Sequence, residues 1–257
     1  MIGNTKLLDE LADLVTLVDN ERYSRFQVKI LIVGVPSIVK EYFNKTPTRA
    51  TVVNRIKELR EVARLSPQEC DRLVETGFVK ELQFSSSPLD VMTVQNHVRK
   101  ITDRIPQRVH EYCLELAQLC QGDRKLDPSK LQDADKAWLR SQLSDVYQTI
   151  ERVMNERETR AQRRNQVLYC LGVWEREEFR YTDIEPLVRE QFPVSVAGIN
   201  LNVSQILSEL ASGHDKLLKR SIRGDAYLFI EPRVRMCLRA MLRKIDEKIE
   251  RVEIQGI

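Results

Sequence analysis

The chain has 257 residues, of which 42% are apolar and 31% are charged, and its formal net charge is +3. This length allows two or three compact units, and the composition is that of a folded protein. Nine Gly and nine Pro are too few for a loop-rich β fold. The sequence has no leader peptide pattern and no apolar run of the roughly 20 residues that a membrane span needs. We therefore expect a cytoplasmic protein without membrane contact.

The five cysteines are scattered, none of them forms a C-x-x-C pair, and the three histidines lie far apart. This distribution argues against a metal site and favours reduced, mostly buried thiols.

The first 65 residues show an α/β alternation. Apolar residues recur at helical spacing from Thr5 to Val18, which predicts a helix. The segment VKILIVGV, Val28 to Val35, is a continuous β-branched run, typical of a strand that is buried on both faces of a parallel sheet. A helix is predicted from about Ser37 to Phe43. We interpret residues 1–65 as part of an α/β domain, although one strand does not make a sheet.

From Ser66 the pattern becomes helical. Ser66 and Glu69 match a capping box around Pro67, which predicts a helix start. This helix should run to about Glu75, and two more should cover about 89–102 and 106–120. The polar segment of about 129–161 predicts one long helix that serves as a spacer or packs between domains and is not a core element.

The last segment predicts three helices, a two-stranded wing and a closing helix. The helices cover about 166–174, about 181–191 and a stretch that is capped by Asn202 and carries an apolar stripe. Residues 217–230 predict a β-hairpin, and a final helix is expected at about 232–252. This order describes a winged helix-turn-helix, so the chain should be mainly α with minor β structure.

Four motifs occur in an order that resembles a known family. They are IGNTKLLDELADLV with the strand VKILIVGV, then TVVNRIKELREVARLSPQECDRLVETGF, then HVRKITDRIPQRVHEYCLELA, and finally the presumed wing with its closing Pro. Together they resemble the C-terminal part of bacterial AAA-type, ORC-like P-loop ATPases. The resemblance implies a remnant of the α/β nucleotide-binding core at 1–65, a helical lid at 66–121, a linking helix at 122–163 and a winged helix-turn-helix domain at 164–257.

The chain departs from that family in its catalytic motifs. It has no G-x-x-x-x-G-K-[ST] loop, because the run from Gly34 to Lys40 lacks the second Gly, and no apolar strand ends in Asp-Glu. Whether the chain is an enzyme is therefore uncertain, but we expect no ATP hydrolysis and no bound cofactor in this chain alone. A complete family member would bind ATP and Mg²⁺. We expect either a fragment or a family member without its catalytic half.

The resemblance also suggests nucleotide-sensing residues. Ser37 lies where sensor 1 is expected, and its alternative role is a helix N-cap. Arg49 and Arg55 lie in the region that supplies an arginine finger, or they are surface residues. Arg108 is close to the sensor 2 position of the lid, where Gln107 stands in place of the expected arginine.

The presumed winged helix is the main binding candidate. Between Lys216 and Lys244, nine Lys/Arg face two acidic residues, which favours phosphate binding. The candidate contacts are Ser204, Gln205 and Ser208 on the helix after Asn202, together with Lys216, Lys219, Arg220 and Arg223. That helix has no Lys or Arg, and winged helices also bind proteins, so the expected partner is DNA or a protein.

The main hypothesis is the C-terminal portion of a nucleotide-switched AAA-type ATP-binding protein whose winged helix contacts DNA or a partner protein. Self-association through the AAA-type core is part of this hypothesis. The alternative is a stand-alone winged-helix DNA-binding or adaptor protein without nucleotide dependence.

Overall fold

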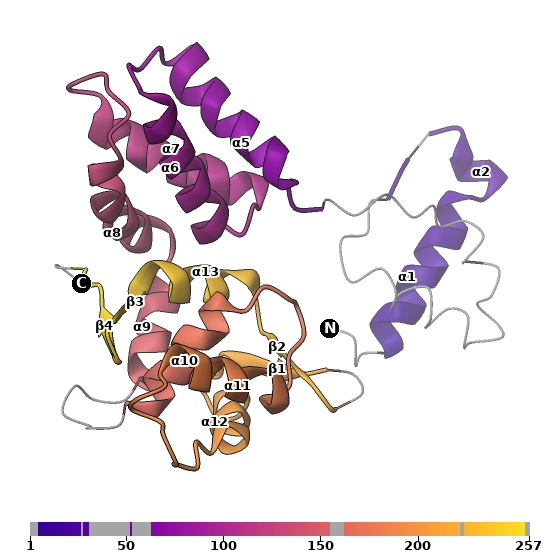
Figure 1. The fold of residues 1–257 in the computed structure, drawn as a ribbon. Helices are drawn as coiled ribbons and strands as arrows, with labels where there is room; N and C mark the ends of the chain where they lie inside the picture. Colours follow the sequence, from indigo (N-terminus) through magenta and orange to yellow (C-terminus); the bar gives the residue numbers. More distant parts are fainter. Residues whose placement is uncertain are drawn as a thin grey trace. The chain divides into compact units, whose positions relative to one another are not determined.

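The computed structural model describes residues 5–26, 28–30, 52, 63–154, 162–221 and 224–254. In these ranges the chain is mainly helical with small antiparallel sheets (Figure 1), as expected from the sequence. The chain divides into two compact units, unit 1 (residues 1–62) and unit 2 (residues 63–257). A further division into lid, linking helix and winged helix stays a prediction.

The elements of unit 2 follow in chain order as α5 Pro67–Glu75, the π-helix η2 Thr76–Glu81, α6 Pro88–Ile101, α7 Pro106–Cys120, the 3-10 helix η3 Pro128–Lys130, α8 Leu131–Gln142, α9 Ser144–Val153, α10 Arg163–Val173, α11 Tyr181–Gln191, α12 Val203–Leu210, β1 Leu218–Arg220, β2 Tyr227–Phe229, α13 Pro232–Met241, β3 Leu242–Ile245 and β4 Lys248–Arg251.

Unit 1 contains α1 (Thr5–Val18) and α2 (Glu21–Ser24), and α1 has the predicted bounds. Residues 28–30 are exposed and have no regular structure, so a buried strand is wrong for these three residues. A strand needs neighbours to satisfy its backbone groups, and no described residue of unit 1 pairs with this segment. Residues 31–35 and the predicted helix at 37–43 lie outside the described residues.

The helix starts of unit 2 follow from local capping. The Ser66 hydroxyl accepts a hydrogen bond from the backbone N–H of Glu69 at 3.2 Å, and the Glu69 carboxylate accepts one from the N–H of Ser66 at 2.8 Å. The predicted capping box is therefore confirmed. Ser87 and Asp90 form the same device at the start of α6. The predicted helix at 106–120 matches α7.

The predicted long polar spacer helix is wrong. The segment forms α8 and α9, which are separated at Leu143, while residues 155–161 lie outside the described part of the chain. Trp138, Leu139 and Ile150 are fully buried, so both helices are core elements. The high charge of the segment obscured an apolar stripe at helical spacing, and one such stripe is enough to bury a helix face.

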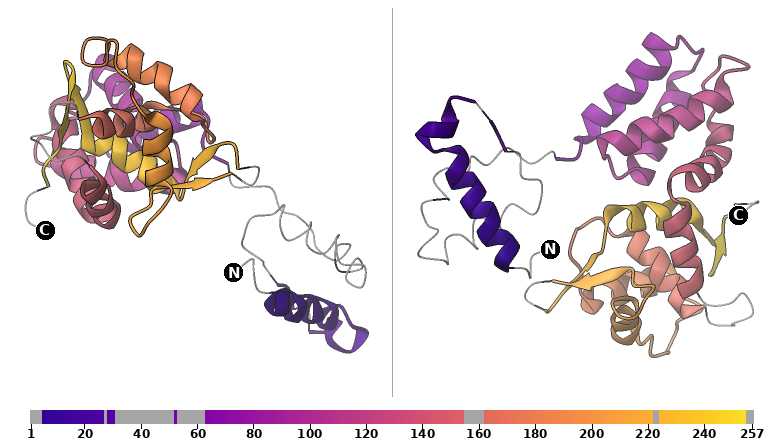
Figure 2. Two further views of the ribbon diagram at one scale, coloured as in Figure 1. Left: turned by 90° about the horizontal axis from the view of Figure 1, so that it is seen from below. Right: turned by 180° about the vertical axis from the view of Figure 1, so that it is seen from behind.

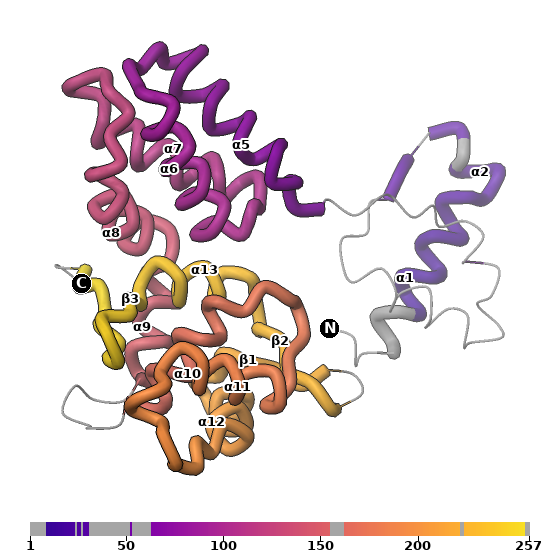
Figure 3. Tube along the Cα trace, viewed as in Figure 1, coloured from indigo at the N-terminus to yellow at the C-terminus, as the bar shows by residue number. Residues whose placement is uncertain are grey.

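Helices α10, α11 and α12 are followed by the β1–β2 hairpin, whose path is traced in Figure 3. The strands are antiparallel, with Lys219 opposite Leu228, so the predicted hairpin at 217–230 is confirmed. Phe179, between α10 and α11, forms a third antiparallel position beside Tyr227. The N–H of Phe179 donates to the carbonyl of Tyr227 at 3.0 Å, and the N–H of Tyr227 donates to the carbonyl of Phe179 at 2.8 Å.

Helix α13 is shorter than predicted. It ends at Met241, and a β3–β4 hairpin replaces the rest of the predicted helix at 232–252. The turn between these strands contains Asp246 at φ 54°, a left-handed conformation that a helix does not tolerate. After the turn, Ile249, Val252 and Ile254 are buried. The apolar spacing in this region therefore belongs to a hairpin, in which alternate residues face the core.

Helix α13 packs against α6, α8, α9 and α10, and so lies between the first helices of unit 2 and α10–α12 (Figures 1 and 3). Gly172 of α10 allows this close packing, because a Cβ there would lie 3.1 Å from the Cβ of Leu238. The helix therefore joins the two ends of the unit 2 core.

Candidate nucleic-acid interface

Helix α12 presents a polar outer surface that carries no Lys or Arg. Val203, Ile206, Leu207 and Leu210 are buried, which turns Ser204 and Gln205 to solvent and leaves Ser208 half-buried. Asn202 occupies the predicted N-cap position, but it is left-handed at φ 51° and its side chain makes no capping hydrogen bond. This surface offers hydroxyl and amide groups and no Lys or Arg.

The acidic residue Glu209 lies near the end of the same helix, and its carboxylate already has partners within the chain. Its carboxylate pairs with Arg164 of α10 and accepts a hydrogen bond from Gln205 Nε2 at 3.0 Å. One N–H of the Gln205 amide is therefore engaged with Glu209, and its second N–H and its Oε1 remain for a base edge. Cationic contacts to phosphates near α12 have to come from another element.

The β1–β2 hairpin supplies exposed cations next to α12. The backbone N–H of Leu217 donates to the carbonyl of Leu210 at 2.8 Å, which fixes the hairpin to the end of α12. Lys216, Lys219 and Arg220 are exposed, and the Arg220 guanidinium lies 5.4 Å from the centroid of the Tyr227 ring. Figure 2 shows strands β1 and β2 of this hairpin in two further views. Arg223, the fourth cation predicted here, lies outside the described residues.

The predicted basic patch between Lys216 and Lys244 is wrong as one surface. The side chains of Arg235 and Arg239 are only 1% and 7% exposed. Arg233 forms ion pairs with Glu231 at 2.8 Å and with Asp145 at 3.1 Å. These arginines belong to α13, which is buried against the other helices, so they offer no charge to a partner.

Arg235 and Arg239 instead contact a buried carboxylate at the end of α6. Arg235 donates to one oxygen of Asp103, and Arg239 Nη1 lies 3.3 Å from the other. Arg64 Nη2 lies 3.0 Å from the oxygen that Arg235 contacts. Burial lowers the pKa of Arg239, and the charge of Asp103 opposes that effect. Asp103 is left-handed at φ 54° and its environment is fixed by these contacts.

Carbonyl groups complete the shell around these arginines. Arg235 Nη1 donates to the carbonyls of Glu175 at 3.1 Å and Arg176 at 3.2 Å, and Arg239 Nε donates to Gly172 at 2.6 Å. Since buried charges are stable only when they are paired and hydrogen-bonded, this cluster holds α13 against the ends of α6 and α10.

Of the residues predicted to sense nucleotide, Arg108 alone lies within the described residues. Arg108 of α7 is half-buried and pairs with Glu111 one turn away at 2.7 Å. Ser37, Arg49 and Arg55 lie outside the described residues. Arg108 in this state is bound within its own helix.

The histidines, cysteines and acidic residues in the described part of the chain bear on metal binding and thiol reactivity. No group of His, Cys, Asp and Glu there could hold a metal ion. All five cysteines are free thiols, and burial raises the pKa of Cys70 to about 11 and that of Cys170 to about 12. These two thiols are therefore not ionised at neutral pH.

None of the described helices is long and apolar enough to cross a membrane.

A comparison with protein-family models, curated proteins and solved structures finds no match for this chain. The chemistry of the interface therefore has to be taken from its own geometry.

Sequence reasoning missed the Asp103 cluster and a second cluster around Asp135. The buried Asp135 Oδ1 accepts hydrogen bonds from His97 Nε2 and from the Tyr112 hydroxyl, each at 2.7 Å. No sequence motif predicts either cluster, because the residues of each cluster come from elements that are distant in sequence. Asp103 follows the end of α6, whereas Asp135 lies within α8.

Proposed function

We propose that residues 162–230 form a winged helix that binds duplex DNA through the β1–β2 wing. The observation that carries this proposal is the order α10, Phe179, α11, α12, β1, β2, with Phe179 and β1 flanking β2 in one antiparallel arrangement. A helix, a β-bridge residue, two helices and a hairpin in this order fit the winged form of the helix-turn-helix.

In this proposal the wing and α12 have different roles. Lys216, Lys219 and Arg220 are exposed on or beside the hairpin, where they can contact phosphates. Ser204 and Gln205 of α12 can reach base edges with hydroxyl and amide groups. Since α12 has no cation, the wing carries most of the affinity, and α12 contributes at most modest sequence preference.

We further propose that this module is part of a nucleotide-switched AAA-type ATP-binding protein, in which the helices α5–α9 correspond to the lid and linker. The succession of these helices and the winged-helix order supports this proposal. The absence of a P-loop motif from the sequence predicts no magnesium-dependent ATPase activity in the purified chain. Turnover above background would be inconsistent with it.

An adaptor role that binds a partner protein is the second candidate. Residues 163–230 contain nine basic and nine acidic residues, so the module is neutral overall. A neutral module with a cation-free α12 attracts a polyanion less strongly than a basic one does. This candidate predicts that substitution of the wing leaves duplex binding weak and unchanged.

Fluorescence anisotropy with a labelled duplex, measured on the full chain over a salt series, separates these candidates. For DNA binding by the wing, K219A/R220A/R223A should weaken binding and reduce the slope of log affinity against log salt by about 0.9 for each lost phosphate contact. The matched control R72A/K80A/K125A removes three cations that are exposed on α5, η2 and the loop after α7. Equal effects of the two triple variants would exclude a specific role of the wing.

A further inference from the structure

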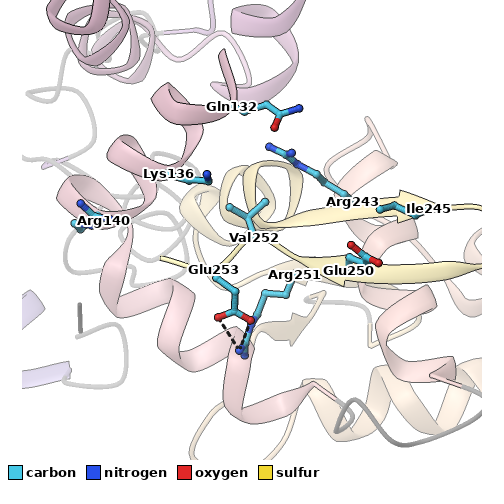
Figure 4. A pocket seen from close by; sticks show the side chains of 9 residues that line it. All are labelled: Gln132, Lys136, Arg140, Arg243, Ile245, Glu250, Arg251, Val252 and Glu253. Atoms are coloured by element: carbon cyan, nitrogen blue, oxygen red, sulfur yellow. Dashed lines mark hydrogen bonds and ion pairs between the residues drawn. The ribbon is translucent and has the colours of Figure 1, made fainter. Parts of the chain in front are cut away.

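A second basic surface lies outside the proposed winged helix. It is a groove with a volume of about 430 Å³ between α8 and the β3–β4 hairpin (Figure 4). Its polar lining includes Gln132, Lys136 and Arg140 from α8, and Arg243, Glu250 and Arg251 from the hairpin. Gln132, Lys136 and Arg140 are four residues apart, so they occupy one face of α8. A groove of this volume has room for a small ligand or a short part of a polymer.

Two of the groove cations are weakly engaged. Arg140 is exposed and has no ion-pair partner in the described residues. Lys136 lies 3.5 Å from Asp133, but both side chains are largely exposed, at 44% and 65%, and such pairs contribute little. Arg251 differs, because it pairs with Glu151 and with Glu253 at 3.2 Å. Lys136 and Arg140 therefore keep hydrogen-bond donors for a ligand.

Arg243 lies near the buried carboxylate of Asp135 but does not form a hydrogen bond with it. Its Nη2 lies 3.7 Å from Oδ2 of Asp135, which is close enough for attraction but too long for a hydrogen bond. The other oxygen of Asp135 is held by His97 and Tyr112. The guanidinium is thus attracted toward a fixed buried carboxylate, while its N–H donors remain available to the groove.

We propose that this groove binds a phosphate-bearing ligand through Lys136, Arg140 and Arg243. Cations from two elements, a helix and a strand, meet at one open groove, and Gln132 adds an amide donor. The guanidinium groups of Arg140 and Arg243 present paired donors that match two phosphate oxygens, and the Lys136 ammonium group adds a third positive charge. The site is separate from the wing and does not depend on the winged-helix proposal.

Glu250 opposes an anion in this groove. It is exposed and lies directly opposite Arg243 in the β3–β4 register. Removing its charge while keeping its shape should strengthen anion binding, because a like charge near the ligand disappears. E250Q should therefore bind more tightly than the unchanged chain, by about threefold to tenfold.

The test is calorimetry on the full chain with two probes, inorganic pyrophosphate and single-stranded dT12. K136Q/R140Q/R243Q should weaken the binding of at least one probe by about tenfold or more. K136Q/R140Q, which leaves Arg243 and Asp135 intact, should show a large part of that loss and guards against misfolding. R72Q/K80Q/K125Q is the matched control and should bind like the unchanged chain.

The two probes distinguish the source of the phosphate. Groove-dependent binding of pyrophosphate alone indicates a small phosphate compound, and groove-dependent binding of dT12 that pyrophosphate displaces indicates a nucleic-acid backbone. K219A/R220A/R223A should retain groove binding, so failure of the wing proposal leaves this one standing. The proposal is overturned if neither probe binds, or if the groove and control triple variants lose the same affinity.

Discussion

The wing and α13 are neighbours in sequence and carry the same kind of side chain, yet they use it in opposite ways. Lys219 and Arg220 of the wing are exposed, whereas Arg235 and Arg239 of α13 are buried against Asp103. The difference in exposure arises because other helices cover α13 and leave one face of the wing open. A hairpin at the edge of unit 2 has one free face, while α13 is packed by helices on several sides. Charge counted along a sequence therefore does not measure charge on a surface.

The largest expected effect tests the buried half of this contrast. D103A leaves Arg235 and Arg239 without their carboxylate, and breaking a buried ion pair in this way costs about 3–5 kcal/mol. Urea unfolding of the full chain measures the loss. D225A is the matched control, because it breaks the exposed pair of Asp225 with Arg180 and should cost no more than about 1 kcal/mol. Similar losses for both variants would mean that the Asp103 cluster is not a stabilising contact.

A smaller effect tests how tightly α13 is packed. In G172A the new Cβ would lie 3.1 Å from the Cβ of Leu238, so the two helices have to move apart. Overpacking lowers the free energy of unfolding by about 1–3 kcal/mol, and the higher helix propensity of Ala raises it by about 1 kcal/mol. We expect a net loss of about 1 kcal/mol in the free energy of unfolding.

The control for that measurement is G77A, because a Cβ at Gly77 meets nothing within 4 Å. G77A should leave stability unchanged or raise it slightly, by up to about 1 kcal/mol. If G172A is as stable as G77A, the α10–α13 contact is looser than the structure indicates.

Substitution of the exposed wing residues Lys219 and Arg220 should change the stability of the fold only slightly. K219A should shift the free energy of unfolding by less than about 0.5 kcal/mol, since Lys219 is exposed. R220A also removes the contact with the Tyr227 ring and should cost about 0.5–1 kcal/mol. Both are measured by urea unfolding, with R235A as the buried counterpart. A loss in K219A as large as that in R235A would remove the distinction between the two elements.

The smallest expected effect concerns acid stability at the base of the wing. The hydrogen bond from Arg152 lowers the pKa of Asp215, which precedes Lys216. A carboxyl with a lowered folded pKa stabilises the fold above its unfolded pKa of about 3.9, and this contribution is lost as the pH falls through the folded value. D215N should thus be slightly less stable than the unchanged chain at neutral pH.

The two proteins should approach each other in stability as the pH falls below about 4, which thermal unfolding over a pH series measures. A difference that stays constant over that series would contradict an electrostatic role of Asp215. D246N, at the exposed β3–β4 turn, is the matched control, since the structure gives Asp246 no ion pair in the described residues.

Local signals predicted much of unit 2. The capping box at Ser66 and the bounds of α7 followed from residues that are close together in sequence. The hairpin of β1 and β2 also followed from a local turn pattern. One error occurred where the helical and the strand spacing of apolar residues both fit the same segment. The segment after Met241 has apolar residues that fit a helix or a hairpin, and a left-handed Asp246 decides for the hairpin.

The candidate interface was predictable in part. Ser204, Gln205 and Lys219 are exposed on the elements where the sequence placed them. The additional cations of α13 were assigned to the same surface in error, because burial is not visible in a charge count. The groove at α8 was missed, since Lys136 and Arg243 are brought together from segments on either side of the proposed winged helix.

The sequence by itself determined the elements whose signals act over a few residues, such as caps, apolar stripes and turns. It also determined the lack of a P-loop motif and the lack of a cation in α12. The tertiary structure decided which charges are buried and which face a partner. Arg239 contacts Asp103 across 136 residues of sequence, and only packing of α13 between α6 and α10 creates that contact. Long-range pairing depends on the whole core, so no local pattern encodes it.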